Sequence, residues 1–431
     1  MTLIFIFGGL FVLVMLGVPI LLAIASVSLA GVSLIDGLVP ALMAQKSFAM
    51  LDSFSLLALP YFILAGSIMA RGGLSEGLIG FSQKIVGHIR GSLGHTAVLS
   101  CTAMANVSGS STAEAAAVGS VIIPAMRKAG YRPGLAASIV AASATIGPII
   151  PPSMTMIIYG SMTGVSIGGL FLAGVLPGLM VAFTLMAVIY GMSYLPGYPE
   201  LRAVLPRATL RQILRSTVEV WPALLAPFVI MGGILGGIFT ATEAGVIACI
   251  YSLAVSVLWY RAIAWKDLFL ILIDAAITTA MVAGVIGMAG ALGWMLSFLS
   301  FNDLMLANLR GITESPMVML LILLALMLLL TMLLDGLAVV VVLVPTIVYI
   351  GQHFALDPMQ LGILMIMITQ IAGLTPPVAI LLFITTSIAK TSFMATVRES
   401  GPFVGALLFV LAMVVLVPSL ATWLPGLAFA P

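Results

Sequence analysis

A stretch of short, oxygen-bearing side chains interrupts otherwise apolar sequence between residues 106 and 112. Its chemistry-bearing members are Asn106, Ser108, Gly109, Ser110 and Ser111. A nearby interruption, 147–152, contains prolines, which lack an amide donor and leave backbone carbonyls free. Because hard cations prefer oxygen ligands, these residues together with Gly147 and Pro148 predict a sodium site. The alternative is that the hydroxyls only satisfy helix backbone or allow close packing.

The second half of the chain has a comparable group with fewer hydroxyls and one carboxylate. Its members are Thr331, Asp335, Gly336, Gly373, Thr375 and Pro376. The break at 373–377 matches the break at 147–152, since both combine glycine with a Pro-Pro pair. We therefore expect a second sodium site here.

Three carboxylates stand where a new helix is expected to begin: Glu114, Glu243 and Asp335. An acid at membrane depth costs roughly 2.5–3.5 kcal/mol on insertion scales, so each one needs a structural role. We interpret all three as caps for the free amides in the first turn of a helix. For Glu114 and Asp335, direct ligation of an ion is the alternative.

The composition excludes an aqueous globular protein. Of 431 residues, 62% are hydrophobic and 7% are charged, whereas soluble domains carry roughly 25% charged residues. Continuous apolar runs indicate membrane-spanning helices rather than alternating barrel strands. We predict an all-α polytopic membrane protein surrounded by lipid. The near balance of 16 basic and 14 acidic residues excludes a nucleic-acid surface, and the sparse cysteines and histidines form no metal or haem pattern.

Breaker residues and charges divide the chain into two halves, 1–192 and 218–431, joined by a basic linker at 193–217. Each half is expected to contain about five helices, a re-entrant hairpin and a broken helix. The hairpins are predicted at 92–126 and 316–350, and the broken helices at 134–160 and 358–388. Other helices are expected near 3–16, 19–35, 48–70, 166–190, 219–238, 243–260, 268–300 and 401–425.

The two halves repeat one residue pattern. Glu114 stands before Pro124 at the same spacing as Asp335 before Pro345, and each half has its Pro-Pro pair. This agreement indicates a duplication. With five spans in each half the repeats are inverted, and of the 16 basic residues only Lys46 and Arg310 then lie on the second face. The positive-inside rule makes the basic face cytoplasmic and both termini periplasmic.

Two sequence motifs of common enzymes are absent, the phosphate-binding Gly-x-x-x-x-Gly-Lys and the metal-binding His-Glu-x-x-His. We therefore predict that the chain is not an enzyme. Paired broken helices in inverted repeats are typical of alternating-access transporters. Without a nucleotide site, such transport would draw on an ion gradient.

At these interruptions the chain resembles the large, DctM-like membrane subunit of tripartite ATP-independent periplasmic (TRAP) transporters, within the ion transporter superfamily. The resemblance covers essentially the whole chain, and it is carried by residues 16–20, 108–114, 147–153, 237–244 and 373–377. Ala241 and Ala379 depart from the family pattern, which commonly has proline and glycine there. These departures concern the local geometry of helix starts.

The resemblance implies sodium-driven uptake of an organic acid by an elevator motion in the bacterial inner membrane. Family substrates include C4-dicarboxylates, sialic acids and other sugar acids. A soluble periplasmic binding protein would deliver the acid, and a separate membrane subunit of about four helices would complete the transporter. The resemblance also implies that the acid lies beside Ser110, Pro151, Pro152, Thr375 and Pro377.

The main alternative is a one-component sodium/anion symporter of the same superfamily, which would need no partners. An intramembrane enzyme using Asp335 or His95 is disfavoured, because such an enzyme has no need of paired broken helices. A passive channel is disfavoured for the same reason. Uptake by this chain without a binding protein would favour the one-component symporter.

Overall fold

The computed structural model describes residues 2–35 and 38–429, and within these residues the chain is helical without a strand. Within the described part of the chain, eight helices are long and apolar enough to cross a membrane. In lipid a helix satisfies its backbone hydrogen bonds internally, so long apolar segments adopt this structure. The prediction of an all-α polytopic membrane protein is confirmed.

The first half begins with two helices that pack against each other and ends with a long helix that finishes at Met192. Its elements are α1 (Thr2–Met15), α2 (Ile20–Ser33), α3 (Ala41–Leu51), η1 (Phe54–Leu57), α4 (Ala58–Arg71), α5 (Leu74–Val86), α6 (Ser92–Ser108), α7 (Ser111–Lys128), α8 (Pro133–Ala144), α9 (Met154–Thr163) and α10 (Ile167–Met192). The pair α6 and α7 occupies the predicted hairpin region, and α8 and α9 occupy the predicted broken helix.

The linker contains η2 (Pro199–Arg202), and the second half again has two successive pairs of helices followed by a long one. Its elements are α11 (Leu210–Leu235), which begins within the linker, α12 (Ala241–Ala254), the π-helical turn η3 (Val255–Trp259), α13 (Trp265–Phe298), α14 (Phe301–Arg310), α15 (Pro316–Leu333), α16 (Gly336–His353), α17 (Pro358–Ala372), α18 (Ile380–Ala389), α19 (Phe393–Leu416) and α20 (Ser419–Ala428). Here α15 and α16 correspond to the predicted hairpin, and α17 and α18 to the broken helix.

The two hairpins pack in matching ways on the broken helices. The second helix of the first hairpin, α7, packs on α8 and α18, and the second helix of the other hairpin, α16, packs on α17 and α9. Each hairpin therefore contacts one broken helix of its own half and one of the other half. This arrangement brings the four chain interruptions to one region of the molecule.

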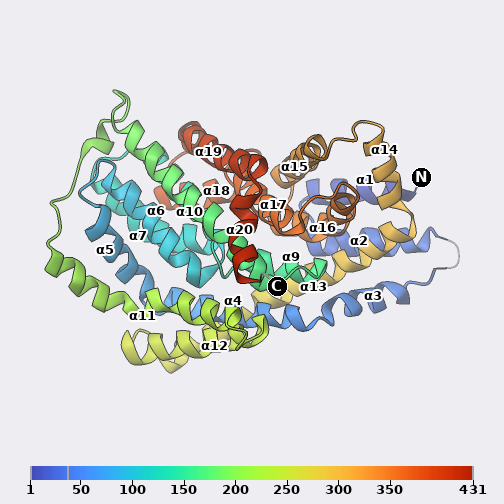
Figure 1. Cartoon of the computed structure of the whole chain (residues 1–431), viewed down its shortest axis with the longest axis horizontal. Helices are drawn as coiled ribbons and strands as arrows, with labels where there is room; N and C mark the ends of the chain where they lie inside the picture. The colour runs from blue at the N-terminus through green and yellow to red at the C-terminus, as the bar shows by residue number, and fades with distance from the viewer. Residues whose placement is uncertain (1, 36–37, 430–431) are drawn as a thin grey trace.

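A long helix, α13, supports this region from one side. It packs along α2, α3 and α4, and it also contacts α16 (Figure 1). Arg71 at the end of α4 forms an ion pair with Asp274 on α13. Thus α13 connects the helices at the start of the chain with the second hairpin.

A cluster around Arg132 fixes the segment that follows α10. The Arg132 side chain pairs with Glu200 in η2 at 2.7 Å and with Glu399 in α19 at 2.9 Å. Its guanidinium carbon lies 4.7 Å from the centre of the Tyr198 ring, within the range of a cation–π contact. Both carboxylates are largely buried, so this arginine links the α7–α8 loop, η2 and α19.

Several predicted helix boundaries were wrong. The helix expected at 48–70 is interrupted at Asp52 and Ser53, where α3 ends and η1 begins. Helix α11 begins at Leu210, inside the expected linker, because Thr209 and Gln212 form a capping box there. The short helix α14 was not predicted, and the final helix is two helices, α19 and α20, separated near Pro418.

Candidate functional site

The tip of the first hairpin is a tight reversal between α6 and α7. Gly109 has φ +55°, a left-handed conformation that glycine adopts without strain. Ser110 is the N-cap of α7, and its hydroxyl accepts a hydrogen bond from the Ala113 amide. A Cβ at Gly109 would lie 2.6 Å from the Pro152 carbonyl oxygen. The tip therefore rests directly against the break between α8 and α9.

Behind this tip lies a fully buried carboxylate, that of Glu114. Its Oε1 accepts a hydrogen bond of 2.7 Å from the Ser108 hydroxyl, whereas its Oε2 has no hydrogen-bond partner among the described residues. A Cβ at Gly147 would lie 2.5 Å from Oε1, so any larger residue at that position would displace the carboxylate. The N-cap of α7 is Ser110, so Glu114 contacts the end of α6 instead of taking the predicted capping position.

The break that faces this carboxylate is a buried chain of turns. Helix α8 ends at Ala144, and the amides of Ile149 and Ile150 both donate to the carbonyl of Ile146. Ser153 then caps α9 by accepting from the Met156 amide. These hydrogen bonds stabilise the backbone of residues 145–153 although the segment is not a regular helix.

The tip of the second hairpin is organised by Asp335. This residue is the N-cap of α16, and its carboxylate accepts from the amides of Leu337 and Ala338 at 3.0 and 3.2 Å. Gly336 lies close to α17, since a Cβ there would be 3.1 Å from the Thr369 Cβ. The Thr331 hydroxyl donates to the carbonyl of Met327 in its own helix.

The second break differs from the first in how its following helix begins. Helix α18 starts after Ala379, which has φ +42°, and no side chain caps its first turn. The Leu381 amide donates to the carbonyl of Gly373, which ties the start of α18 to the end of α17. Thr375 donates its hydroxyl proton to the carbonyl of Ile371. No side chain therefore neutralises the positive end of the α18 dipole.

A cavity of about 390 Å³ lies where both tips and both breaks meet. Such a volume suits a small organic molecule. The cavity is lined by Gly109, Ser110, Ser111, Thr112, Pro148, Met154, Thr155, Ile158, Thr278, Met281, Val282, Asp335, Gly336, Leu337, Thr369, Gln370, Gly373, Ile380 and Leu381. Within this lining Asp335 is the one ionisable side chain. The first turns of α7, α9, α16 and α18 all reach the cavity wall.

The cavity unites some of the predicted site residues and leaves others behind its wall. Those that line it are Gly109, Ser110, Ser111, Pro148, Asp335, Gly336 and Gly373, and those that do not are Asn106, Ser108, Gly147, Pro151, Pro152, Thr331, Thr375, Pro376 and Pro377. Asn106 donates to the carbonyl of Thr102 at 3.4 Å, within its own helix. Glu243 lies elsewhere, in a capping box with Thr240 at the start of α12.

Sequence reasoning missed four polar residues of the cavity wall: Thr155, Thr278, Thr369 and Gln370. The threonines lie in apolar helices, where a hydroxyl commonly bonds to its own backbone and gives no signal. Gln370 is different, because its side-chain amide needs both a hydrogen-bond acceptor and a hydrogen-bond donor as partners, and an apolar run supplies neither. The isolated glutamine in this run was therefore a signal from which the polar site could have been predicted.

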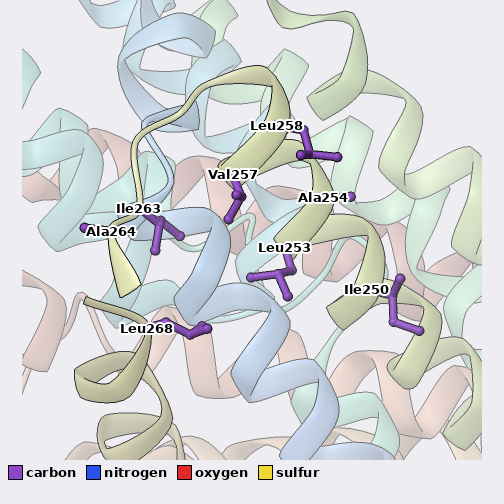
Figure 2. Close-up of a pocket in the computed structure, with 8 residues that line it drawn as sticks. All are labelled: Ile250, Leu253, Ala254, Val257, Leu258, Ile263, Ala264 and Leu268. Atoms are coloured by element: carbon purple, nitrogen blue, oxygen red, sulfur yellow. The ribbon is translucent and has the colours of Figure 1, made fainter. Parts of the chain in front are cut away.

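An apolar pocket elsewhere in the molecule cannot take the same role. It is lined by Ile250, Leu253, Ala254, Val257, Leu258, Ile263, Ala264 and Leu268, between the end of α12 and the start of α13 (Figure 2). These side chains offer no hydrogen-bonding group. A pocket of this kind has no means of recognising a charged or polar molecule.

The fold and the polar cavity define a class: a polytopic α-helical membrane protein of the transporter type, with paired hairpins around one site. The particular family follows from the sequence. The profile of the family described as tripartite ATP-independent periplasmic transporter, DctM component, matches residues 7–420. The chain belongs to this family, which confirms the resemblance seen in its motifs.

Three relatives show how far the similarity extends. The chain is 35% identical to the 2,3-diketo-L-gulonate TRAP transporter large permease protein YiaN of Escherichia coli K12, over 94% of each chain. It is 34% identical to the sialic acid TRAP transporter large permease protein SiaM of Vibrio cholerae, over 95% of each. It is 35% identical to the C4-dicarboxylate TRAP transporter large permease protein DctM of Pseudomonas aeruginosa, over 89% of each. All three are named as permeases and not as enzymes.

Proposed function

We propose that this chain carries out sodium-coupled uptake of an organic acid anion across the bacterial inner membrane. The single observation that carries the proposal is the cavity between the two hairpin tips, where four helix starts and a group of hydroxyls meet. The names of the relatives, which refer to a sugar acid, sialic acid and C4-dicarboxylates, support an organic acid as the substrate.

The sodium part of the proposal rests on two carboxylates without basic partners. No ion pair is found for Glu114 or Asp335 among the described residues. Glu114 is fully buried, and a buried carboxylate without a partner is costly, so a bound cation or a proton would remove that cost. The oxygens of Ser108 and Glu114 at one tip, and of Asp335 at the other, suit a hard monovalent ion. We assign one sodium ion to each tip region.

The acid itself would be held by backbone amides more than by basic side chains. The positive ends of helix dipoles and their free amides attract anions. Four helices begin at the cavity, and α18 begins without a side-chain cap. An anion at the start of α18 would also lie near the sodium bound at Asp335, so that binding of one favours binding of the other.

We further propose an elevator motion for the transport step. The hairpins and broken helices form the moving unit, and the helices at 19–70 and 219–300 form the part that stays with the partner subunit. In support, the moving unit and the stationary helix α13 share the cavity, since Thr278, Met281 and Val282 of α13 line it together with residues of both tips. Movement of the tips past α13 would expose the cavity to one side of the membrane at a time.

The complete transporter would include two partners: a small membrane subunit of four helices and a soluble periplasmic binding protein. With both termini periplasmic, the segment that contains Arg207 and Arg211 would be cytoplasmic. The test is uptake by cells that express this chain with or without the two partners. The proposal predicts sodium-dependent uptake only with all three proteins. Uptake by the chain alone would identify a one-component symporter.

A further inference from the structure

Gln370 is a polar residue of the cavity wall with an unused acceptor. It lies in the last turn of α17, its exposed fraction is 7%, and it lines the cavity. Its Nε2 donates to the Thr369 hydroxyl oxygen at 3.0 Å, whereas its Oε1 has no hydrogen-bond partner among the described residues. A buried amide oxygen without a partner is unfavourable, so this position calls for a donor from elsewhere.

The orientation of this amide follows from its neighbour. The Thr369 hydroxyl donates its proton to the carbonyl of Ile366 at 2.7 Å. Its oxygen can then only accept a hydrogen bond, so the amide nitrogen of Gln370 must face it. The oxygen of Gln370 and the second hydrogen of its nitrogen are left for a ligand. A hydroxyl group matches this pair, because it donates and accepts at once.

The charges around the cavity restrict what else the ligand carries. Asp335 is the one ionisable residue in the cavity lining, and it is acidic. At the other three helix starts a side chain already accepts from the first-turn amides: Ser110 in α7, Ser153 in α9 and Asp335 in α16. Only α18 begins without such a cap. The cavity therefore offers one place for a carboxylate, and a second carboxylate would meet no free helix start.

We propose that Gln370 hydrogen-bonds a hydroxyl group of the transported acid, whose carboxylate lies at the start of α18. Gln370 thereby selects a hydroxylated monocarboxylate over an unsubstituted dicarboxylate. The Leu381 amide at the start of α18 donates to the carbonyl of Gly373, which lies one turn beyond Gln370. The start of α18 and the Gln370 amide are therefore close enough to contact one small molecule. This inference rests on the proposed function, since it names the substrate class of the same cavity.

Three six-carbon acids separate the contributions of the hydroxyls and the charges. D-gluconate has hydroxyls and one carboxylate, hexanoate has one carboxylate and no hydroxyl, and adipate has two carboxylates and no hydroxyl. Binding of each acid to the purified full-length chain in detergent with sodium is measured by the shift in thermal unfolding. We expect D-gluconate to bind at least about tenfold more tightly than hexanoate, the effect of one or two well-formed hydrogen bonds. Adipate should bind no better than hexanoate.

The decisive variant is Gln370→Met, which keeps the length of the side chain and removes its hydrogen bonds. It should weaken D-gluconate binding about tenfold and leave hexanoate binding unchanged. Gln370→Asn, which keeps the amide but shortens its reach, should also weaken D-gluconate binding, and it serves if the methionine variant does not fold. The matched control is Gln360→Met, because Gln360 is equally buried in α17 but its Nε2 donates to the Val414 carbonyl and it does not line this cavity.

The control variant should lower the thermal stability without changing the preference for D-gluconate. Equal binding of adipate and D-gluconate, no binding of D-gluconate, or unchanged binding by the Gln370 variants would overturn the inference. These results are distinguishable from failure of the proposed function. If uptake depends on sodium but the Gln370 variants bind D-gluconate as the wild type does, only the proposed role of Gln370 is contradicted. If uptake does not depend on sodium, the proposed sodium coupling is contradicted.

Discussion

Ser108 and Glu114 join the two helices of the first hairpin directly behind its tip. The hydroxyl of Ser108, the last residue of α6, donates to Oε1 of the buried Glu114 carboxylate in the first turn of α7, at 2.7 Å. Gly147 of the break packs against the same carboxylate. The hairpin tip and the break are therefore organised around one acidic group, whose second oxygen is unpartnered within the described chain.

Replacement of this acid by its amide tests whether it binds the coupling ion. Glu114→Gln keeps the size of the side chain and its acceptor oxygen for Ser108 but removes the negative charge. If the carboxylate helps to hold sodium, the sodium concentration for half-maximal uptake should rise by at least about tenfold. The measurement is initial uptake rate against sodium concentration in cells with both partner proteins.

The matched control is Glu243→Gln, at the start of α12 far from the tips. Glu243 closes a capping box with Thr240, and glutamine serves in that motif as well. This variant should change the sodium dependence little. If the Glu114→Gln variant and the wild type show the same sodium dependence of uptake, Glu114 has only a structural role at the first tip.

A pair of glycine variants tests the contact between the tip and the break. Gly109 and Gly130 both have positive φ, but a Cβ at Gly109 would lie 2.6 Å from the Pro152 carbonyl oxygen, whereas a Cβ at Gly130 meets nothing within 4 Å. Gly130→Ala should therefore cost only the backbone strain, about 1–2 kcal/mol. Gly109→Ala should cost more and stop uptake. Equal loss of stability and uptake in both would show that the close approach is not needed.

Asp335 has a structural role as a helix cap and a proposed role in binding sodium, and two variants separate these roles. Asparagine caps helices as well as aspartate, so Asp335→Asn should leave the stability nearly unchanged, whereas Asp335→Ala should lose about 1 kcal/mol. Both remove the charge, so both should raise the sodium concentration needed for half-maximal uptake. Normal sodium dependence in the asparagine variant would restrict Asp335 to capping. Unfolding in detergent and uptake assays supply the two readouts.

The fold could be predicted from the sequence to the extent that apolar length and chain breakers determine it. Gly147 to Pro152 interrupts an apolar run with residues that cannot continue a helix, and the structure has its break there. The break at Asp52 was missed because a short polar pair does not outweigh apolar sequence on either side. The early start of α11 was missed because the basic residues near Arg211 resemble a loop.

The site was less predictable, because tertiary contacts decide what each polar residue does. Glu114, Asp335 and Glu243 all follow the same local pattern at a helix start. In the structure Asp335 and Glu243 accept from first-turn amides, whereas Glu114 turns to Ser108, since Gly147 leaves room for it there. Gln370 joins the cavity only because α17 packs beside the second tip, a contact that no local pattern encodes.

Crosslinks across the proposed boundary between moving and stationary parts test the elevator. A Cβ at Gly293 of α13 would lie 3.8 Å from Cγ of the Pro345 ring in α16, so cysteines at these two positions are near enough for crosslinking with a short, reducible crosslinker. This crosslink should stop uptake, and reduction should restore it. The control pair, Gly284 with Leu21, joins α13 to α2 within the stationary part, where a Cβ would lie 3.2 Å from Leu21. Full uptake with the first crosslink complete would contradict the motion.

The central claim is that a sodium gradient drives the acid through this chain. The most direct measurement uses proteoliposomes that contain the chain and its small membrane subunit, with the binding protein and radiolabelled acid outside. Succinate, sialic acid and D-gluconate are each tested with sodium or choline in the outer buffer. Sodium coupling predicts accumulation of one acid above its outside concentration with an inward sodium gradient, and loss of that accumulation when a sodium ionophore is added. Equal accumulation in choline, or accumulation that survives the ionophore, would contradict it.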